Sequence, residues 1–227
     1  MDILDLVFPK RCVNCGRWGE YVCEECQVGM WEEEQICPTC CRNSRYGERH
    51  KYCRGELEGL TCLWAYEGIA RKLITKAKYS GQFDVLEFLI SNFPFDSAQG
   101  EQFFYFKKFL ETNPIIVPVP LHPKREKERG FNQATIVASL IANRYSLVVK
   151  NLLTRVKDTG RQVGKKREER LKAMSGAFEL SRDTPYVIPN TILLVDDVWT
   201  TGATLRECAK VLRRGGAKQV WGLVLAR

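Results

Sequence analysis

The sequence predicts an α/β protein in which helices flank a mainly parallel sheet, with a small cysteine-rich domain before it. From Pro114 onward, apolar runs of strand length alternate with segments of helical periodicity, the pattern of a parallel sheet covered by helices. One run, residues 192–195, is apolar throughout and ends in two adjacent carboxylates. Such a run is typical of a strand buried on both faces. Most of the ten cysteines lie in the first quarter of the chain, so we expect domains at residues 1–56 and 57–227.

The length and composition fit a globular protein. A chain of 227 residues accommodates one domain of ordinary size and a small one, and a hydrophobic content of 44% allows a sizeable core. No apolar run approaches the roughly 20 residues that cross a bilayer, so we expect no membrane insertion. Residues 1–10 lack the features of a signal peptide, which predicts a cytoplasmic location.

The segment after Gly55 is expected to form one strand and then a group of helices. The apolar run at residues 60–66 predicts the strand. Helices are expected at residues 68–76, 82–92 and 101–111. Residues 93–100 contain Pro, Asp, Ser and Gly, which predicts a surface loop between the last two helices.

The second half of the larger domain is expected to alternate between strands and helices. Strands are predicted at residues 115–119, 147–149, 192–195 and 220–225, and helices at residues 132–145 and 205–214. Apolar residues at Ile136, Leu140 and Ile141 give the first of these helices its periodicity. Ligands of parallel sheets bind beyond the carboxyl ends of the strands. A site is therefore expected after Val195.

Asp196 and Asp197 occupy that position. Adjacent carboxylates can accept hydrogen bonds from two neighbouring hydroxyls, as on a ribose ring. The loop that follows opens a helix, so backbone N–H groups and the helix dipole would face a bound phosphate. The candidate phosphate ligands are Thr200, Thr201, Gly202, Ala203 and Thr204. The alternative is an ordinary strand–turn–helix whose acids are solvated.

Four pairs of potential metal ligands, each separated by two residues, lie in the first domain. They are Cys12 and Cys15, Cys23 and Cys26, Cys37 and Cys40, and His50 and Cys53. This spacing lets both side chains of a turn reach one tetrahedral Zn²⁺, so we expect two structural zinc ions. Sequential and interleaved combinations of the pairs both remain open, and free or redox-active thiols are the alternative to zinc. Cys41 is expected to be a bystander, and Cys62 and Cys208 to be core residues.

Zinc would also change the charge of the protein. The formal net charge of +8 counts every cysteine as neutral. One site of four thiolates and one of three thiolates with a histidine would lower it to roughly +5. The domain contains too few large apolar residues to fold without metal.

Two further polar segments are candidates for binding anions. At the end of the strand 115–119, Lys124, Arg125 and Arg129 supply positive charge that a pyrophosphate would require, although a solvated basic loop is the alternative. The segment 155–178 begins with Arg155 and Gln162 and continues with basic residues. It could form a lid over a substrate, a flap for nucleic-acid phosphates, or a disordered linker.

The loop after Asp197 resembles the signature of type I phosphoribosyltransferases, which bind 5-phosphoribosyl-1-pyrophosphate (PRPP). The order of motifs along the chain resembles the ComF family more specifically. These motifs are the cysteine pairs, Lys78-Tyr79, Pro-Val-Pro-Leu-His-Pro, Arg-Gly-Phe-Asn-Gln at 129–133, an Arg…Gln…Arg…Gly-Ala-Phe segment and the Asp-Asp loop. The resemblance covers nearly the whole chain. It implies an amino-terminal zinc module, a type I phosphoribosyltransferase domain, and Mg²⁺ bound together with PRPP.

The resemblance also implies roles for individual residues. By position, it assigns functional roles to Lys78, Arg129, Asn132, Gln133, Arg155, Gln162, Arg167, Arg170 and the loop from Asp196 to Thr204. Lys124 adds its charge to the PRPP-binding candidates. The sequence departs from the family pattern at Trp199, where an aliphatic residue is usual, at Ala173, where the family has Asn, and at His50, where cysteine is common.

The resemblance implies a role in natural transformation, with single-stranded DNA and proteins of the DNA-uptake machinery as partners. An enzyme would use Asp196 and Asp197 as catalytic residues that position the sugar while an acceptor displaces pyrophosphate. A nucleic-acid module would instead track DNA with residues 124–129 and 165–172 and stack bases on an exposed Trp199. Phe131 is a weaker stacking candidate because helix packing explains it better. We expect a PRPP-Mg²⁺ protein of DNA uptake; the alternative is a phosphoribosyltransferase with an unidentified acceptor, outside DNA uptake.

Overall fold

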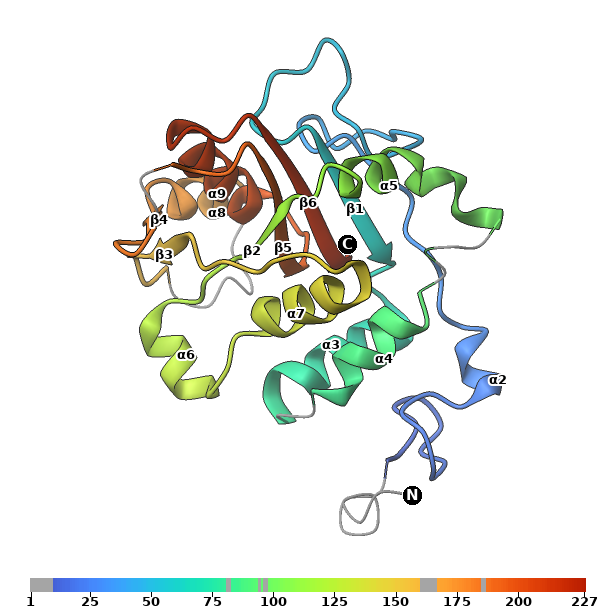
Figure 1. The fold of residues 1–227 in the computed structure, drawn as a ribbon. Helices are drawn as coiled ribbons and strands as arrows, with labels where there is room; N and C mark the ends of the chain where they lie inside the picture. The colour runs from blue at the N-terminus through green and yellow to red at the C-terminus, as the bar shows by residue number, and fades with distance from the viewer. Residues whose placement is uncertain (1–9, 81–82, 94, 96–97, 160–166, 185–186) are drawn as a thin grey trace.

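The protein is described by a computed structural model that covers residues 10–80, 83–93, 95, 98–159, 167–184 and 187–227. Its centre is a four-stranded parallel sheet with the strand order β1-β6-β5-β2 (Figure 1). The strands are β1 (Gly59–Trp64), β2 (Ile115–Pro118), β5 (Thr191–Val198) and β6 (Gln219–Ala226). The predicted α/β class with a parallel sheet is confirmed. The strand expected at residues 147–149 is reduced to a single bridge between Val149 and Ile116.

Helices cover both faces of the sheet, which explains why the strands are continuous apolar runs. One face carries α3 (Gly68–Ser80), α4 (Asp84–Ser91), η1 (Ala98–Phe103), α5 (Phe104–Leu110) and α7 (Gln133–Tyr145). The opposite face carries α8 (Arg167–Met174) and α9 (Ala203–Arg214) (Figure 1). Along β5, Leu193 and Val195 enter the first core, whereas Ile192 and Leu194 enter the second. Alternate residues of one strand therefore hold both layers together.

The segments around the sheet contain structure that the sequence pattern does not predict. Helix α6 (Pro123–Arg129) has Pro at its first position, His122 as N-cap and Gly130 as a left-handed C-cap. The strands β3 (Leu153–Arg155) and β4 (Phe178–Leu180) form an antiparallel pair outside the main sheet. The segment expected to be a lid or linker is thus anchored at both ends. Residues 160–166, which include Gln162, lie outside the described residues.

The cysteine-rich segment runs along the outer edge of β1. Glu32 and Glu48 form antiparallel bridges with Trp64 and Gly59, one at each end of the strand. Between them, the Gln35 side chain donates to the Cys62 carbonyl and accepts from the Cys62 N–H, at 2.8 and 3.0 Å. The segment therefore covers the edge that β1 would otherwise expose. It also contains the short helix α2 (Glu24–Gln27).

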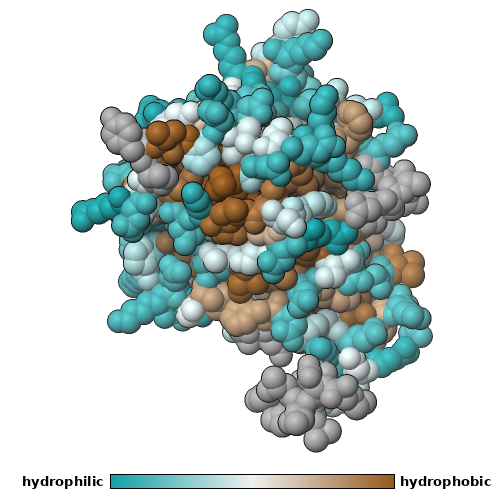
Figure 2. All heavy atoms as spheres, viewed as in Figure 1, coloured by the Kyte–Doolittle hydropathy of each residue, from teal (hydrophilic) through white to brown (hydrophobic). Residues whose placement is uncertain are grey.

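The surface on the side seen in Figure 1 is mostly hydrophilic, with hydrophobic residues visible between the polar side chains (Figure 2). Among the described helices, α3 and α7 are the longest, with 13 residues each. Within the described part of the chain, no helix is both long and apolar enough to cross a membrane.

Candidate functional site

Two adjacent carboxylates lie near the carboxyl end of β5, as the sequence predicts. The backbone N–H of Asp197 donates to Asp196 Oδ1 at 2.8 Å, which fixes the Asp196 carboxylate against the backbone of Asp197. Lys78 Nζ, in the last turn of α3, lies 2.8 Å from Asp197 Oδ2. The Lys78 and Asp197 side chains are only 19% and 17% exposed. This ion pair is therefore partly shielded from solvent and joins helix α3 to the strand end.

The two carboxylates have different electrostatic environments. Desolvation, reinforced by the charge of Asp197, raises the pKa of Asp196 to about 7, although Lys78 and Arg155 oppose the shift. Burial alone would lower the pKa of Lys78, but its ion pair with Asp197 outweighs burial and raises that pKa. Near neutral pH, Asp196 is consequently balanced between its charged and neutral forms. A bound cation or donor would favour the charged form.

The loop after β5 presents an uncapped helix N-terminus. Gly202 is the N-cap residue of α9, with a left-handed φ of 74°, and as a glycine it has no side chain with which to cap the helix. The first N–H groups of an α-helix have no intrahelical partner. Within the loop, one of these groups, the Ala203 N–H, makes only a long contact of 3.4 Å, with Thr201 Oγ1. The arrangement can accept an anionic group at this end of the helix.

Trp199 does not offer the exposed stacking surface that the nucleic-acid interpretation of the sequence requires. Its side chain is buried at 3% exposure and packs beneath Gly202. A Cβ atom at Gly202 would lie only 2.2 Å from Trp199 Cζ2, so this glycine is required both by its φ and by the indole ring. The small residues of the loop leave room for the ring to fold inward. Trp199 therefore supports the loop from below. Phe131, as expected, packs against another side chain, with its ring centroid 4.3 Å from that of Phe83.

A second set of polar side chains, which includes Asn132 and Gln133, lies at the end of the neighbouring strand β2. The Val119 N–H donates to the Val195 carbonyl at 2.9 Å, so this strand end adjoins Asp196. Asn132 donates to the Val119 carbonyl and accepts from the Ala134 N–H, which fixes the start of α7 there. Gln133 follows, with 2% exposure, and its Oε1 accepts from Arg129 Nη1 at 2.6 Å.

Two buried donors at the site have no hydrogen-bond partner among the described residues. They are Gln133 Nε2 and Arg155 Nε. Arg155, in β3, is 7% exposed, and its Nη2 donates to Thr159 Oγ1. Burial, and next the charge of Arg125, lower the pKa of Arg155, whereas Asp196 opposes this shift. Buried donors are normally satisfied, so these two are candidates for hydrogen bonds to a bound ligand.

Most of the predicted site residues are brought to this edge of the sheet, but not all of them. Lys124 lies exposed on α6, where only its backbone N–H has a described contact, with His122 Nδ1 at 3.3 Å. Thr200 is exposed at the loop tip, and the Thr204 hydroxyl donates to Met174 Sδ of α8 at 3.6 Å. The backbone of Arg167 and Arg170 belongs to α8. The loop therefore lies between α8 and the strand ends.

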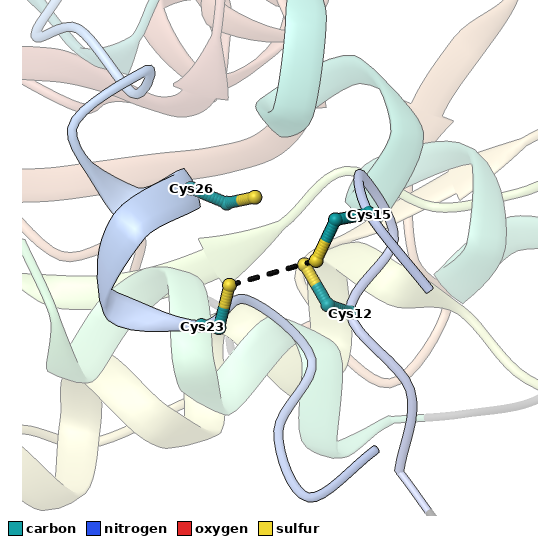
Figure 3. Close-up of side chains that lie close together, drawn as sticks. All are labelled: Cys12, Cys15, Cys23 and Cys26. Carbon is teal, nitrogen blue, oxygen red and sulfur yellow. Dashed lines mark hydrogen bonds between the residues drawn. The ribbon is translucent and has the colours of Figure 1, made fainter. Parts of the chain in front are cut away.

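The cysteine pairs combine sequentially into two tetrads. Cys12, Cys15, Cys23 and Cys26 form the first cluster, and Cys37, Cys40, His50 and Cys53 form the second; in each, the ligand atoms all lie within 4.8 Å of one another. Figure 3 shows the four sulfurs of the first cluster pointing toward a common centre, with Cys15 and Cys23 Sγ 3.6 Å apart.

This geometry fits zinc. Tetrahedral Zn–S bonds of about 2.3 Å place neighbouring sulfurs about 3.8 Å apart. In the second cluster, His50 Nδ1 lies 3.4 Å from Cys40 Sγ, and His50 Nε2 lies 3.0 Å from the Asn43 carbonyl. That contact leaves Nδ1 available as the ligand atom and orients the ring, as outer partners of metal-bound histidines do. Cys41 lies outside both tetrads.

Cys62 and Cys208 are fully buried, as expected of core residues, and burial raises the pKa of both thiols. Neither thiol therefore ionises readily.

Family models match both parts of the chain. Residues 3–55 match the family model of a double zinc ribbon domain, and residues 127–227 match that of a phosphoribosyl transferase domain. The protein thus combines a double zinc ribbon with a phosphoribosyltransferase-type α/β domain.

Several relatives are similar to this chain in sequence. Competence protein F of Haemophilus influenzae is 38% identical over 123 residues, which is 52% of each chain. Competence protein ComFC of Bacillus subtilis is 26% identical over 92% of this chain and 85% of the relative. DNA utilization protein YhgH of Escherichia coli is 27% identical over 96% of this chain and 98% of the relative. Over most of its length, the chain is therefore similar to proteins named for competence and DNA utilization.

Proposed function

We propose that this chain binds PRPP together with Mg²⁺ at the carboxyl edge of its sheet, and that it acts in the handling of single-stranded DNA during uptake. In this proposal, residues 1–56 form a zinc domain and residues 57–227 the phosphoribosyltransferase-like domain. One observation carries this proposal: Asp196 and Asp197 lie at the same edge of the sheet as the N-terminus of α9 and the unsatisfied donors of Gln133 and Arg155.

Each part of PRPP has a complementary group at this edge. Asp196 and Asp197 would accept hydrogen bonds from the ribose hydroxyls. The N–H groups and hydroxyls of residues 200–204 would bind the 5′-phosphate. Gln133, Arg155 and Arg129 of α6 would bind the pyrophosphate. Mg²⁺, when bound, would offset the charge of the pyrophosphate oxygens.

The DNA part of the proposal is supported by the relatives, whose names are competence proteins and DNA utilization proteins. The basic residues on α6 are compatible with an acidic polymer. Burial of Trp199 removes it as a base-stacking side chain, so any DNA contact would depend on other residues.

A second candidate is a phosphoribosyltransferase that acts on an unidentified acceptor outside DNA uptake. The observation that favours it is Asp196, whose pKa of about 7 suits a group that exchanges a proton at neutral pH. Release of pyrophosphate from PRPP in the presence of an acceptor would distinguish turnover from binding alone.

The test is calorimetric binding of PRPP with Mg²⁺ to the full chain and to the double variant Asp196→Asn, Asp197→Asn. We expect the double variant to bind at least about 100-fold more weakly, because two charged acceptors are lost. Asp183→Asn, an exposed acid in the turn after β4, is the matched control and should bind normally. Single-stranded DNA binding, measured at two salt concentrations, should persist in the double variant. A wild-type chain that binds no PRPP would overturn the proposal.

A further inference from the structure

Arg206, in the first turn of α9, contacts both the second cysteine cluster and the candidate phosphate loop. On the cluster side, its Nε donates to the Pro38 carbonyl at 2.7 Å and its Nη2 to the Thr39 carbonyl at 3.1 Å. On the loop side, its Nη1 donates to the Thr201 carbonyl at 3.2 Å. One planar guanidinium therefore joins two segments that are more than 160 positions apart in the sequence.

The contacted carbonyls belong to functional turns. Pro38 and Thr39 are the two residues between the ligands Cys37 and Cys40, so the shape of their turn depends on the cluster. Thr201 lies directly before Gly202, the N-cap of α9. Arg206 also lies over the Trp199 ring, 5.2 Å from its centroid, and its Nη2 is 3.2 Å from Cys41 Sγ. It therefore contacts the residue that supports the loop as well as the loop itself.

The charge of Arg206 is unusual at this place. A cation in the first turn of a helix is disfavoured by the helix dipole. Here three backbone carbonyls surround the guanidinium and offset that cost. Lysine could not replace it, because an ammonium lacks the planar fork that reaches carbonyls on two sides.

We propose that Arg206 is a positioning residue through which the second cysteine cluster sets the geometry of the phosphate loop. This inference rests in part on the proposed PRPP site, because the loop is the part of that site that binds the 5′-phosphate. An ordered second cluster holds the Pro38 and Thr39 carbonyls in place, and Arg206 transfers that order to the Thr201 backbone. Loss of the cluster then releases the loop through Arg206.

Arg213 provides a matched control on the same helix. It donates to the Glu56 carbonyl at 3.1 Å and pairs with the Glu58 carboxylate, so it too joins the segment that follows the cysteine clusters to α9. It lies seven residues after Arg206, about 10 Å further along the helix and away from the loop. A variant at Arg213 therefore removes a comparable contact without reaching the loop.

The first experiment compares zinc-loaded full-length Arg206→Gln, Arg206→Lys and Arg213→Gln with the wild type. Without ligand, hydrogen exchange at residues 203–205 should become about tenfold faster in Arg206→Gln. In Arg206→Lys, the exchange rate should lie between those of the wild type and Arg206→Gln. Arg213→Gln should leave these amides unchanged. The dissociation constant for PRPP with Mg²⁺ should rise about tenfold in Arg206→Gln and less than twofold in Arg213→Gln. If Arg206→Gln does not fold, Arg206→Lys carries the same comparison.

The second experiment tests whether the cluster acts through Arg206. Cys53→Ser should speed exchange at residues 203–205 in the wild-type background and add nothing at those amides in the Arg206→Gln background. Additive effects of the two substitutions, or equal effects of Arg206→Gln and Arg213→Gln on the loop, would overturn the inference. Failure of the wild type to bind PRPP would reject the proposed function alone, because the exchange measurements need no ligand.

Discussion

The two cysteine clusters are each built from two pairs of ligands separated by two residues, but they differ in how they contact the rest of the molecule. The first packs on the face of the sheet that carries α3 and α4, where Tyr21 and Val22 enter the core. Its polar contacts with α3 are exposed, such as that between Lys72 Nζ and Asn14 Oδ1 at 3.0 Å. The second packs on the opposite face, beside α9, and is joined to it by the part-buried hydrogen bonds of Arg206. One cysteine-rich segment thus reaches both sides of a single site.

This difference predicts that both clusters stabilise the fold but that only the second also orders the site. Exposed polar contacts contribute between zero and about 1 kcal/mol, whereas hydrogen bonds to charged groups contribute about 1.5–3 kcal/mol each. The first cluster is therefore expected to stabilise α3 through apolar packing. The second is expected, in addition, to order the loop that precedes α9. Both helices contribute to the site, α3 through Lys78 and α9 through its N-terminus.

The largest effect is expected from removing one ligand of each cluster. Cys26→Ser and Cys40→Ser should each cost one zinc ion, counted by native mass spectrometry, and several kcal/mol of unfolding free energy. Hydrogen exchange should then distinguish the two variants by the region whose amides become exposed. Cys26→Ser should expose amides in α3, and Cys40→Ser should expose those of residues 200–205. The same exchange pattern in both variants would contradict the difference between the clusters.

The sequence predicted the sheet and the ligand clusters better than it predicted the surroundings of the site. Buried parallel strands are continuous apolar runs, and a metal tetrad is encoded by short spacing, so both were visible locally. Helix α6 was missed although Pro123 and Gly130 are typical helix-end signals. The strands β3 and β4 have three residues each and are defined by their pairing, beside α9, rather than by their own pattern.

Long-range contacts explain the remaining failures. Trp199 was expected to be exposed because its neighbours are small, whereas the structure uses that space to bury the ring under Gly202. Arg206 gave no local signal, since its partners Pro38 and Thr39 lie in another part of the chain. Lys78 was found only through the family resemblance, because nothing in α3 indicates that its last turn meets Asp197.

The next effect concerns Asp196, which lies between the α3 side and the α9 side. Its pKa is raised from 3.8 to about 7 in the folded chain, so its contribution to stability is complete below pH 4 and is lost as the pH rises through 7. Since one pKa unit corresponds to about 1.4 kcal/mol, this group can lower the unfolding free energy by up to about 4 kcal/mol between pH 4 and 8. Urea unfolding of Asp196→Asn should show a flatter profile over that range. Parallel profiles for the variant and the wild type would show that Asp196 is not desolvated.

The smallest expected effect tests only the loop before α9, on the side of the second cluster. Gly202→Ala places a methyl group against Trp199 and also strains a φ of 74°, whereas Gly130→Ala strains a similar φ of 81° with open space around it. The backbone penalty of about 1 kcal/mol is therefore common to both variants, and only Gly202→Ala adds a packing cost of about 1–3 kcal/mol. Urea unfolding should show this difference, and PRPP affinity should fall in Gly202→Ala because the added methyl group displaces the loop. Equal losses of stability would mean that the loop moves freely off Trp199, and the second cluster would then have no rigid loop to control.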